Sequence, residues 1–200
     1  MKIAVISDTH IPHKHERLTG RVLAGLEGVD LILHCGDIVA PEVLEELSRY
    51  APVEAVCGNH DEDYFGLELP RKKVVEVQGF RIGMIHGDEL DGLHMNKMLQ
   101  MEYLYRILCE PFIGEPGLDC IVFGHSHKPL LDFLRVEFQP PERVRKSLKK
   151  EVMLFNPGKA TRTRNIASMG YLNIEEGCLR AEIKVFSYRR EHKLYTGEET

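Results

Sequence analysis

The sequence predicts a protein of the α/β class. Short, mostly apolar runs at residues 3–6, 31–33 and 53–56 each break into a polar loop, as the buried strands of a parallel sheet do. Residues 15–27 show helix-like apolar spacing between the first two runs, and Pro41 is well placed to begin a second helix that ends near residue 50. This alternation of strands and helices predicts a parallel βαβαβ unit.

The second half of the chain is predicted to be rich in strands. The segment 93–109 carries apolar residues all around a helix, which predicts a mostly buried packing helix. Residues 139–150 are polar and predict an exposed excursion between two strands, and residues 191–200 predict a frayed tail. The remaining strands are expected at residues 74–77, 81–85, 120–123, 130–138, 152–155, 171–174 and 179–186.

The length and charge of the chain limit its number of domains, its partners and its location. A chain of 200 residues fits one domain, so residues 1–200 are expected to form a single domain. The formal charge of −5 gives no basic footprint for nucleic acid, which is therefore not an expected partner. No apolar run is long enough for a signal peptide or a membrane span, so we expect a cytoplasmic protein without a membrane partner. A homo-oligomer stays an alternative to a monomer, because apolar surface on the predicted helix at 93–109 could form its interface.

Five of the expected strands end in loops whose side chains can bind metal ions. These side chains are carboxylates, imidazoles and one carboxamide, with no thiolate in a ligating position. Such ligands suit Mn²⁺, Fe, Zn²⁺ or Co²⁺ rather than a structural zinc bound by cysteines. The residues are Asp8 and His10, Asp37, Asn59 and His60, His86, and His125 with His127.

The number of these side chains predicts two metal ions. Without His60 there are seven, which is too many for one tetrahedral ion and about right for two ions with room for water or substrate. Asp37 stands alone at its strand end, and its two oxygens can bridge two cations that would otherwise repel strongly. Two ions roughly 3.5–4 Å apart suit an in-line displacement at phosphorus. A water that bridges them would lose a proton near neutral pH and attack as hydroxide.

Two further groups of residues are candidates for roles in catalysis. His60 follows Asn59 in one turn, so its imidazole could protonate a leaving alkoxide, and Asp61 could orient the His60 ring. The turn Asn156-Pro157-Gly158 could bring backbone N–H groups to an anion. The residues that could clamp a phosphate oxygen after this turn are Lys159, Arg162 and Arg164, and a solvated basic loop is the alternative.

From the first strand to about Gly158, the motifs resemble those of the calcineurin-like metallophosphoesterases. The short length, the Asn156-Pro157-Gly158 turn and the β-rich ending are similar to the YfcE-type phosphodiesterase subfamily. The retromer subunit with the same fold is also similar. The motifs that carry the resemblance are Asp8-Thr9-His10, Gly36-Asp37, Gly58-Asn59-His60-Asp61, His86-Gly87 and Gly124-His125-Ser126-His127.

The resemblance implies a four-layer αββα sandwich of two mixed β-sheets flanked by helices. It implies two divalent ions, with Mn²⁺ expected and Fe, Zn²⁺, Ni²⁺ or Co²⁺ as alternatives, and His60 as the general acid. The subfamily often has His-Gly-His where this chain has His86-Gly87-Asp88, which leaves the role of Asp88 open. The implied ligands are Asp8, His10, Asp37 and His127 for one ion, and Asp37, Asn59, His86 and His125 for the other.

We therefore expect a two-metal phosphodiesterase that hydrolyses a small phosphodiester by attack of a metal-bridging hydroxide. A phosphomonoesterase is the nearest alternative, because the same core site serves both reactions and only the shape of the pocket separates them. The alternative from another class is a non-catalytic, retromer-like protein-binding module. Such a module has no need for His60 together with all seven ligands, so the complete set favours the enzyme. A nuclease is disfavoured by the acidic net charge.

Overall fold

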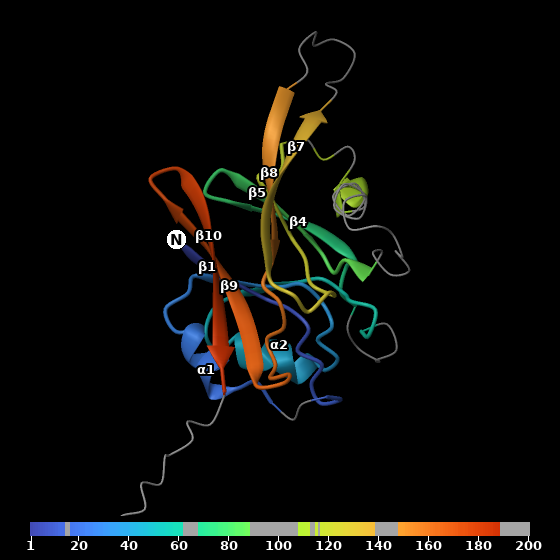
Figure 1. Ribbon diagram of the computed structural model, residues 1–200, viewed down its shortest axis with the longest axis vertical. Helices are drawn as coiled ribbons and strands as arrows, with labels where there is room; N and C mark the ends of the chain where they lie inside the picture. Colours follow the sequence, from blue (N-terminus) through green and yellow to red (C-terminus); the bar gives the residue numbers. More distant parts are fainter. Residues whose placement is uncertain are drawn as a thin grey trace, which may run out of the picture.

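Two five-stranded β-sheets form the body of the protein (Figure 1). The computed structural model describes residues 1–14, 17–61, 68–88, 108–112, 115, 117–138 and 148–188. The strands of the first sheet are, in spatial order, β10 (Cys178–Ser187), β9 (Ile166–Glu175), β1 (Lys2–Ile6), β2 (Leu31–His34) and β3 (Val53–Ala55). The strands of the second sheet are β4 (Lys72–Val77), β5 (Phe80–Ile85), β6 (Cys120–Val122), β8 (Leu148–Asn156) and β7 (Leu130–Phe138).

The predicted βαβαβ unit is confirmed in the first sheet. Strand β1 pairs in parallel with β2, and β2 pairs in parallel with β3. Helices α1 (Gly20–Gly25) and α2 (Pro41–Leu47) make the two crossovers. Helix α1 is shorter than predicted, because Thr19 is still extended, with φ −77° and ψ 147°. In the second sheet β5, β6 and β8 are parallel, whereas the edge strands β4 and β7 are antiparallel to their neighbours. In the first sheet β9 is antiparallel to both β1 and β10. Both sheets are therefore mixed, as the resemblance implied.

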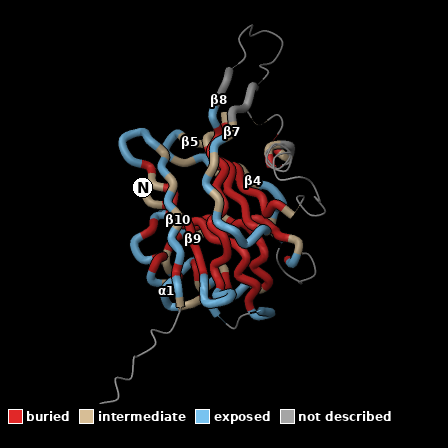
Figure 2. Tube along the Cα trace, viewed as in Figure 1, coloured by how far each residue is buried: buried red, intermediate tan, exposed pale blue. Residues whose placement is uncertain are grey.

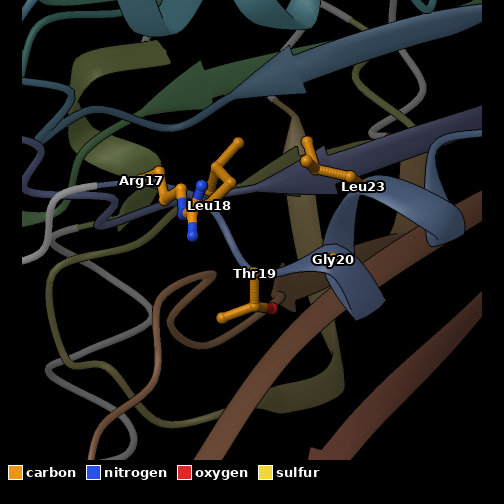
Figure 3. Close-up of a pocket in the computed structure, with 5 residues that line it drawn as sticks. All are labelled: Arg17, Leu18, Thr19, Gly20 and Leu23. Atoms are coloured by element: carbon orange, nitrogen blue, oxygen red, sulfur yellow. The ribbon is translucent and has the colours of Figure 1, made fainter.

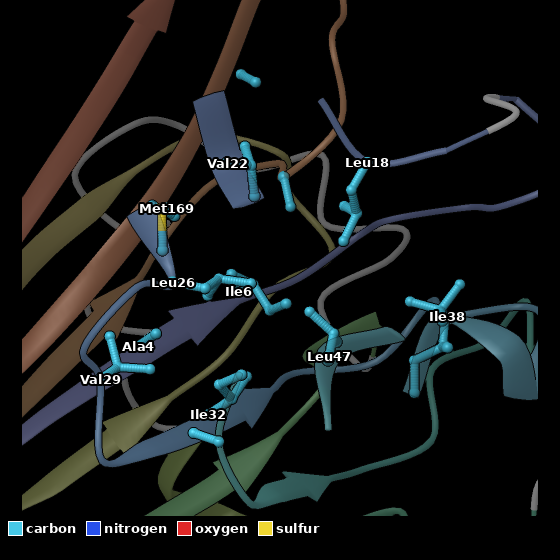
Figure 4. Close-up of a cluster of buried hydrophobic side chains, with 14 of the residues drawn as sticks. Ala4, Ile6, Leu18, Val22, Leu26, Val29, Ile32, Ile38, Leu47 and Met169 are labelled. Atoms are coloured by element: carbon cyan, nitrogen blue, oxygen red, sulfur yellow. The ribbon is translucent and has the colours of Figure 1, made fainter. Parts of the chain in front are cut away.

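Apolar side chains fill the space on both sides of the first sheet. On its outer face, Ile6 and Ile32 pack with Val22, Leu26 and Leu47 from the segments of the two helices (Figure 4). On the inner face, strands of both sheets contribute to one buried cluster, and the buried residues concentrate along these strands (Figure 2). Burial of each large aliphatic side chain contributes about 1.5–3 kcal/mol. This packing holds the carboxyl ends of the parallel strands in place.

On the outer face of the second sheet, Leu108 and Phe112 pack against Phe123 and Leu154. Phe112 belongs to the short 3₁₀ helix η2 (Glu110–Phe112). The rest of the helix predicted at 93–109 lies outside the described residues.

Two strands are much longer than predicted. Strand β8 begins at Leu148 because it pairs with β7 from Phe138 onward, so the last three residues of the predicted excursion are strand. Strand β9 begins at Ile166, because its pairing with β10 continues as far as Ser187. Residues 139–147 of the excursion and the tail at 191–200 lie outside the described residues. None of the helices in the described part of the chain is long and apolar enough to cross a membrane.

Candidate metal centre

Loops from both sheets meet at one place. The loops follow β1, β2, β3, β5 and β6, and each leaves the carboxyl end of its strand. Within this region three groups of side chains each bring their ligand atoms within 4.8 Å of one another. The three groups are Asp8, His10 and His127; His10, Asp37 and His60; and Asp8, Asp37 and His86. The loops at the carboxyl ends of strands from both sheets therefore bring their polar side chains to a single centre.

One side of the centre consists of Asp8, His10 and His127. Nε2 of His127 lies 3.2 Å from Oδ1 of Asp8 and 3.3 Å from Nε2 of His10. Nε2 of His10 also lies 3.5 Å from Oδ2 of Asp37. These atoms are close enough to surround a single cation.

The other side of the centre consists of Asn59, His86 and His125 together with Asp37. Nε2 of His86 lies 3.3 Å from Oδ1 of Asp37 and 3.1 Å from Oδ1 of Asn59. Nδ1 of His86 lies 2.7 Å from the backbone carbonyl oxygen of Cys35, to which its N–H can donate. That hydrogen bond leaves Nε2 as the free ligand atom. The ring of His125 contacts the ring of His86 edge-on at 5.2 Å between centroids. Asp37 thus faces one cluster with Oδ2 and the other with Oδ1.

The chemistry of these groups fits divalent cations. Asp8 is fully buried, and among the described residues its Oδ1 makes no hydrogen bond of good geometry and faces only Nε2 of His127 at 3.2 Å and Nε2 of His10 at 3.9 Å, as expected for an oxygen that shares a cation with these rings. Burial would raise the pKa of Asp37, but hydrogen bonding and charge from His86 hold that pKa well below its usual range. Burial lowers the pKa of His10 to about 3, so its ring is neutral and able to coordinate.

Without a cation, His86 carries the compensating positive charge. Burial alone would lower the pKa of His86, but its contact with Asp37 and the nearby charge of Asp8 raise that pKa to about 9. The two buried carboxylates therefore hold a proton on an imidazole, and a metal ion would replace that proton.

The backbone of these loops is held in an uncommon conformation. Asp8, His10, Asp37, His125 and His127 have φ between 47° and 62°, in the left-handed region. Each non-glycine residue in such a conformation costs on the order of 1–3 kcal/mol, and the conformation persists only where the surrounding structure fixes it. Hydrogen bonds from residues outside the predicted ligand set supply that support.

Asp61 supports the loop of Asp37. Its side chain is 1% exposed, and its two oxygens accept four backbone N–H groups at 2.7–2.9 Å. Three of these N–H groups belong to residues 37–39 and the fourth to Gly58. A carboxylate is needed here because only an acceptor-only group can receive four donors.

This arrangement corrects one expectation from the sequence. The carboxylate of Asp61 is committed to the backbone beside Asp37 and does not orient the His60 ring. His60 is exposed, and its backbone N–H donates to Oδ1 of Asp37 at 2.9 Å. Its ring stands edge-on to the ring of His10, with 5.1 Å between centroids.

Replacing Asp61 with Asn should destabilise the protein and weaken metal binding. The amide nitrogen of asparagine is a donor, so at least one buried N–H would lose its acceptor, at a cost of about 1–3 kcal/mol. Urea denaturation and Mn²⁺ titration would measure the two effects. Asp30→Asn is the matched control, because exposed Asp30 accepts a backbone N–H of Lys2 at 2.6 Å. Equal unfolding midpoints for wild type and Asp61→Asn would contradict the role given to Asp61.

Thr9 and Asn156 also hold the loops, and no sequence pattern indicated these roles. The Thr9 hydroxyl lies 3.3 Å from the carbonyl oxygen of Asp37 and 3.2 Å from Nε2 of buried His34. The Asn156 amide donates to the carbonyl oxygen of Gly124 at 2.6 Å, beside the two histidines of that loop. Both residues lie within motifs, but their partners are distant in the chain.

The turn after β8 does not offer its backbone to an anion as the sequence suggested. The N–H of Gly158 donates to Oδ1 of Asn156 at 2.8 Å, and the N–H of Lys159 donates to Oγ of Ser168 at 3.2 Å. The N–H of Ala160 donates to the carbonyl oxygen of Ser7 at 3.0 Å. These three donors are used within the protein, so any contact with an anion falls to side chains.

The three basic side chains of the predicted clamp are placed differently. Lys159 is 7% exposed and lies beside the loop of Asp8. Arg162 donates to Oδ1 of Asn165 and stacks on the ring of Tyr188 at 5.4 Å, which directs it to that ring. Arg164 is exposed, in a turn.

Asp88, whose role the sequence left open, forms an ion pair with Arg71 at 2.5 Å. A separate pocket at the start of α1 is lined by residues 17–20 and Leu23, and none of the predicted ligands lines it (Figure 3).

Known proteins resemble this chain in sequence and in fold. A Methanothermobacter thermautotrophicus protein named "Probable metallophosphoesterase" is 36% identical over 184 residues, which cover 92% of this chain and 91% of that protein. A phosphodiesterase of Methanocaldococcus jannaschii is 25% identical over 192 residues, covering 88% of this chain and 95% of the relative. The crystal structure of wild-type Vps29 from Entamoeba histolytica complexed with Zn²⁺ has a TM-score of 0.61 at 21% identity, covering 94% of this chain and all of Vps29. Because the profile of the calcineurin-like phosphoesterase superfamily domain also matches residues 1–177, the chain belongs to the calcineurin-like phosphoesterase superfamily.

Proposed function

We propose that the protein is a two-metal phosphodiesterase that hydrolyses a small phosphodiester. The observation that carries the proposal is the position of Asp37, whose two carboxylate oxygens face two different clusters of ligand atoms. Asp8, His10, Asp37 and His127 would hold one ion, and Asp37, Asn59, His86 and His125 the other. Two such ions would activate a water molecule near neutral pH and polarise the phosphoryl oxygens.

Side chains of the protein would balance the charge of the ions, complete the ligand set and supply a proton. The buried carboxylates of Asp8 and Asp37 would offset part of the charge of the ions, and the neutral ring of His10 would complete the ligand set. His60 lies beside Asp37 and His10 with an exposed side chain, so substrate can reach it. A histidine in that position can donate a proton to the oxygen of the leaving alcohol.

Mn²⁺ is the proposed metal, with Fe, Zn²⁺, Ni²⁺ and Co²⁺ as alternatives. Carboxylate, carboxamide and imidazole ligands without thiolate suit Mn²⁺ and the other borderline cations. The Zn²⁺ in Entamoeba Vps29 supports a divalent metal in this fold. The name of the Methanocaldococcus relative supports a diester over a monoester substrate.

Metal removal and reloading tests the proposal. Protein stripped by a chelator should hydrolyse neither bis(p-nitrophenyl) phosphate nor p-nitrophenyl phosphate, and reloading with Mn²⁺ should restore hydrolysis of the diester in preference to the monoester. The release of p-nitrophenolate measures both rates, and elemental analysis measures the bound metal.

Two outcomes would replace the proposal with one of its alternatives. Preferential hydrolysis of the monoester would identify a phosphomonoesterase on the same site. A protein that binds two Mn²⁺ ions yet hydrolyses neither ester would favour a non-catalytic, protein-binding module.

A further inference from the structure

Two lysines lie next to the metal centre without taking part in the proposed ligand set. Lys159 comes from the segment after β8, which runs along the loop that follows β1. The N–H of Ala160 donates to the carbonyl oxygen of Ser7, and the hydroxyl of Thr161 donates to the backbone carbonyl oxygen of Asp8 at 3.4 Å. This pairing fixes Lys159 beside a predicted metal ligand.

The burial of Lys159 is unusual for a lysine. Its side chain is 7% exposed, and within the described ranges no carboxylate lies within 4.0 Å of its ammonium nitrogen. Lysines are rarely buried unless they are paired. Asp8 and Asp37 act on Lys159 only from a longer range. The ammonium group of Lys159 is therefore held near the centre without a close anionic partner from the described protein.

Lys14 brings a second positive charge to the same place. Its backbone N–H donates to the carbonyl oxygen of His10 at 2.9 Å, so the turn after β1 brings Lys14 back beside a predicted ligand. The pKa of Lys159 is lowered first by burial and next by the charge of Lys14. The two lysines therefore lie on segments that both run beside predicted ligands, the exposed Lys14 after His10 and the buried Lys159 along the loop of Asp8.

We infer that Lys14 and Lys159 bind a second phosphate group of the substrate, next to the scissile phosphodiester. This inference rests on the proposed function. A phosphodiester carries one negative charge, and the metal ions would bind its oxygens. Two further cations beside the ions would remain uncompensated by such a substrate. A terminal phosphate carries about −1.5 to −2 charges at pH 7, which matches two ammonium groups. The substrate class is therefore a phosphodiester that also bears a phosphate monoester.

A matched pair of substrates tests the inference by turnover. The p-nitrophenyl ester of thymidine 5′-phosphate and its 3′-phosphorylated form differ by one phosphate group. We expect Mn²⁺-loaded wild type to show a kcat/KM about tenfold or more higher for the 3′-phosphorylated substrate, as two charge-assisted contacts would give. Lys159→Met, which keeps the apolar stem, and Lys14→Gln should each reduce this ratio, and the double variant should bring it near one.

A binding measurement separates this inference from the proposed function. Calorimetry with thymidine 3′,5′-bisphosphate and thymidine 5′-phosphate reports the contribution of the second phosphate whether or not the protein turns over either ester. Lys184→Gln is the control for net charge, since Lys184 lies on the edge strand β10 over the ring of Phe186. We expect this control to keep the wild-type ratios of binding and turnover.

The results of these two experiments distinguish the lysine site from the proposed phosphodiesterase activity. Equal affinity of wild type for the two nucleotides, or an equal loss of the ratio in Lys184→Gln, overturns the inference and leaves the phosphodiesterase proposal standing. Tighter binding of the bisphosphate that depends on both lysines, in a protein that hydrolyses neither ester, supports the lysine site and overturns the proposed activity.

Discussion

Asp37→Ala should abolish the phosphodiesterase activity of the Mn²⁺-loaded protein. Oδ2 of Asp37 faces His10 and Oδ1 faces His86. The loss of Asp37 therefore removes the carboxylate that would lie between two cations and reduce their repulsion. Metal ions supply several kcal/mol of transition-state stabilisation, and kcat/KM should therefore fall roughly 10³-fold or more. Elemental analysis should find at most one tightly bound ion per chain instead of two.

The control for Asp37→Ala is Glu175→Ala, which removes an exposed carboxylate at the end of β9. It should keep both the activity and the metal content of the wild type. Asp37→Asn adds a second test, since asparagine keeps one oxygen but loses the negative charge, and it should also fail to hold two ions. Two bound ions together with wild-type turnover in Asp37→Ala would rule out the bridging role.

His60→Ala should lower kcat/KM by roughly 10²–10⁴-fold, which is the usual contribution of a general acid. Both ions should remain bound, because the seven proposed ligands are intact. The leaving group provides a sharper measurement than the overall rate. p-Nitrophenolate is a good leaving group without protonation. Phenolate and alkoxides are poorer leaving groups, so their departure depends more on proton donation. The loss in His60→Ala should therefore be smaller for a p-nitrophenyl diester than for the corresponding phenyl diester.

An equal loss for the two leaving groups would argue against proton donation by His60. Loss of one metal ion in the same variant would make His60 a ligand instead, which its place in a group with His10 and Asp37 would allow sterically.

The sequence was informative where local pattern and strand order act together. Apolar runs that end in polar loops predicted the parallel strands, and the carboxyl ends of those strands carry Asp8, Asp37 and His86 to a common place. The two mixed sheets followed from the resemblance of the motifs. Among the metal-capable side chains predicted from the sequence, six lie in groups whose ligand atoms are within 4.8 Å of one another, namely Asp8, His10, Asp37, His60, His86 and His127.

The roles that the sequence missed depend on contacts between distant parts of the chain. Asp61 adjoins His60 in the sequence, yet its carboxylate turns to the backbone of residues 37–39. Arg162 and Lys159 are three residues apart, yet Arg162 stacks on Tyr188 and Lys159 lies beside the first loop. Neither spacing nor residue type fixes such directions, because the partners are brought close by tertiary packing.

The position of strand β1 in its sheet also affects how the protein folds during synthesis. It lies in the middle of its sheet, and one of its two neighbours, β9, is more than 150 residues away, with Ala4 opposite Tyr171. Synthesis proceeds from the N-terminus, so β1 waits for this neighbour until most of the chain has emerged from the ribosome. Pairing over such a distance folds slowly, because the entropy of closing a long loop is lost first. We therefore expect the metal centre to be completed late, with ions bound by a nearly finished domain.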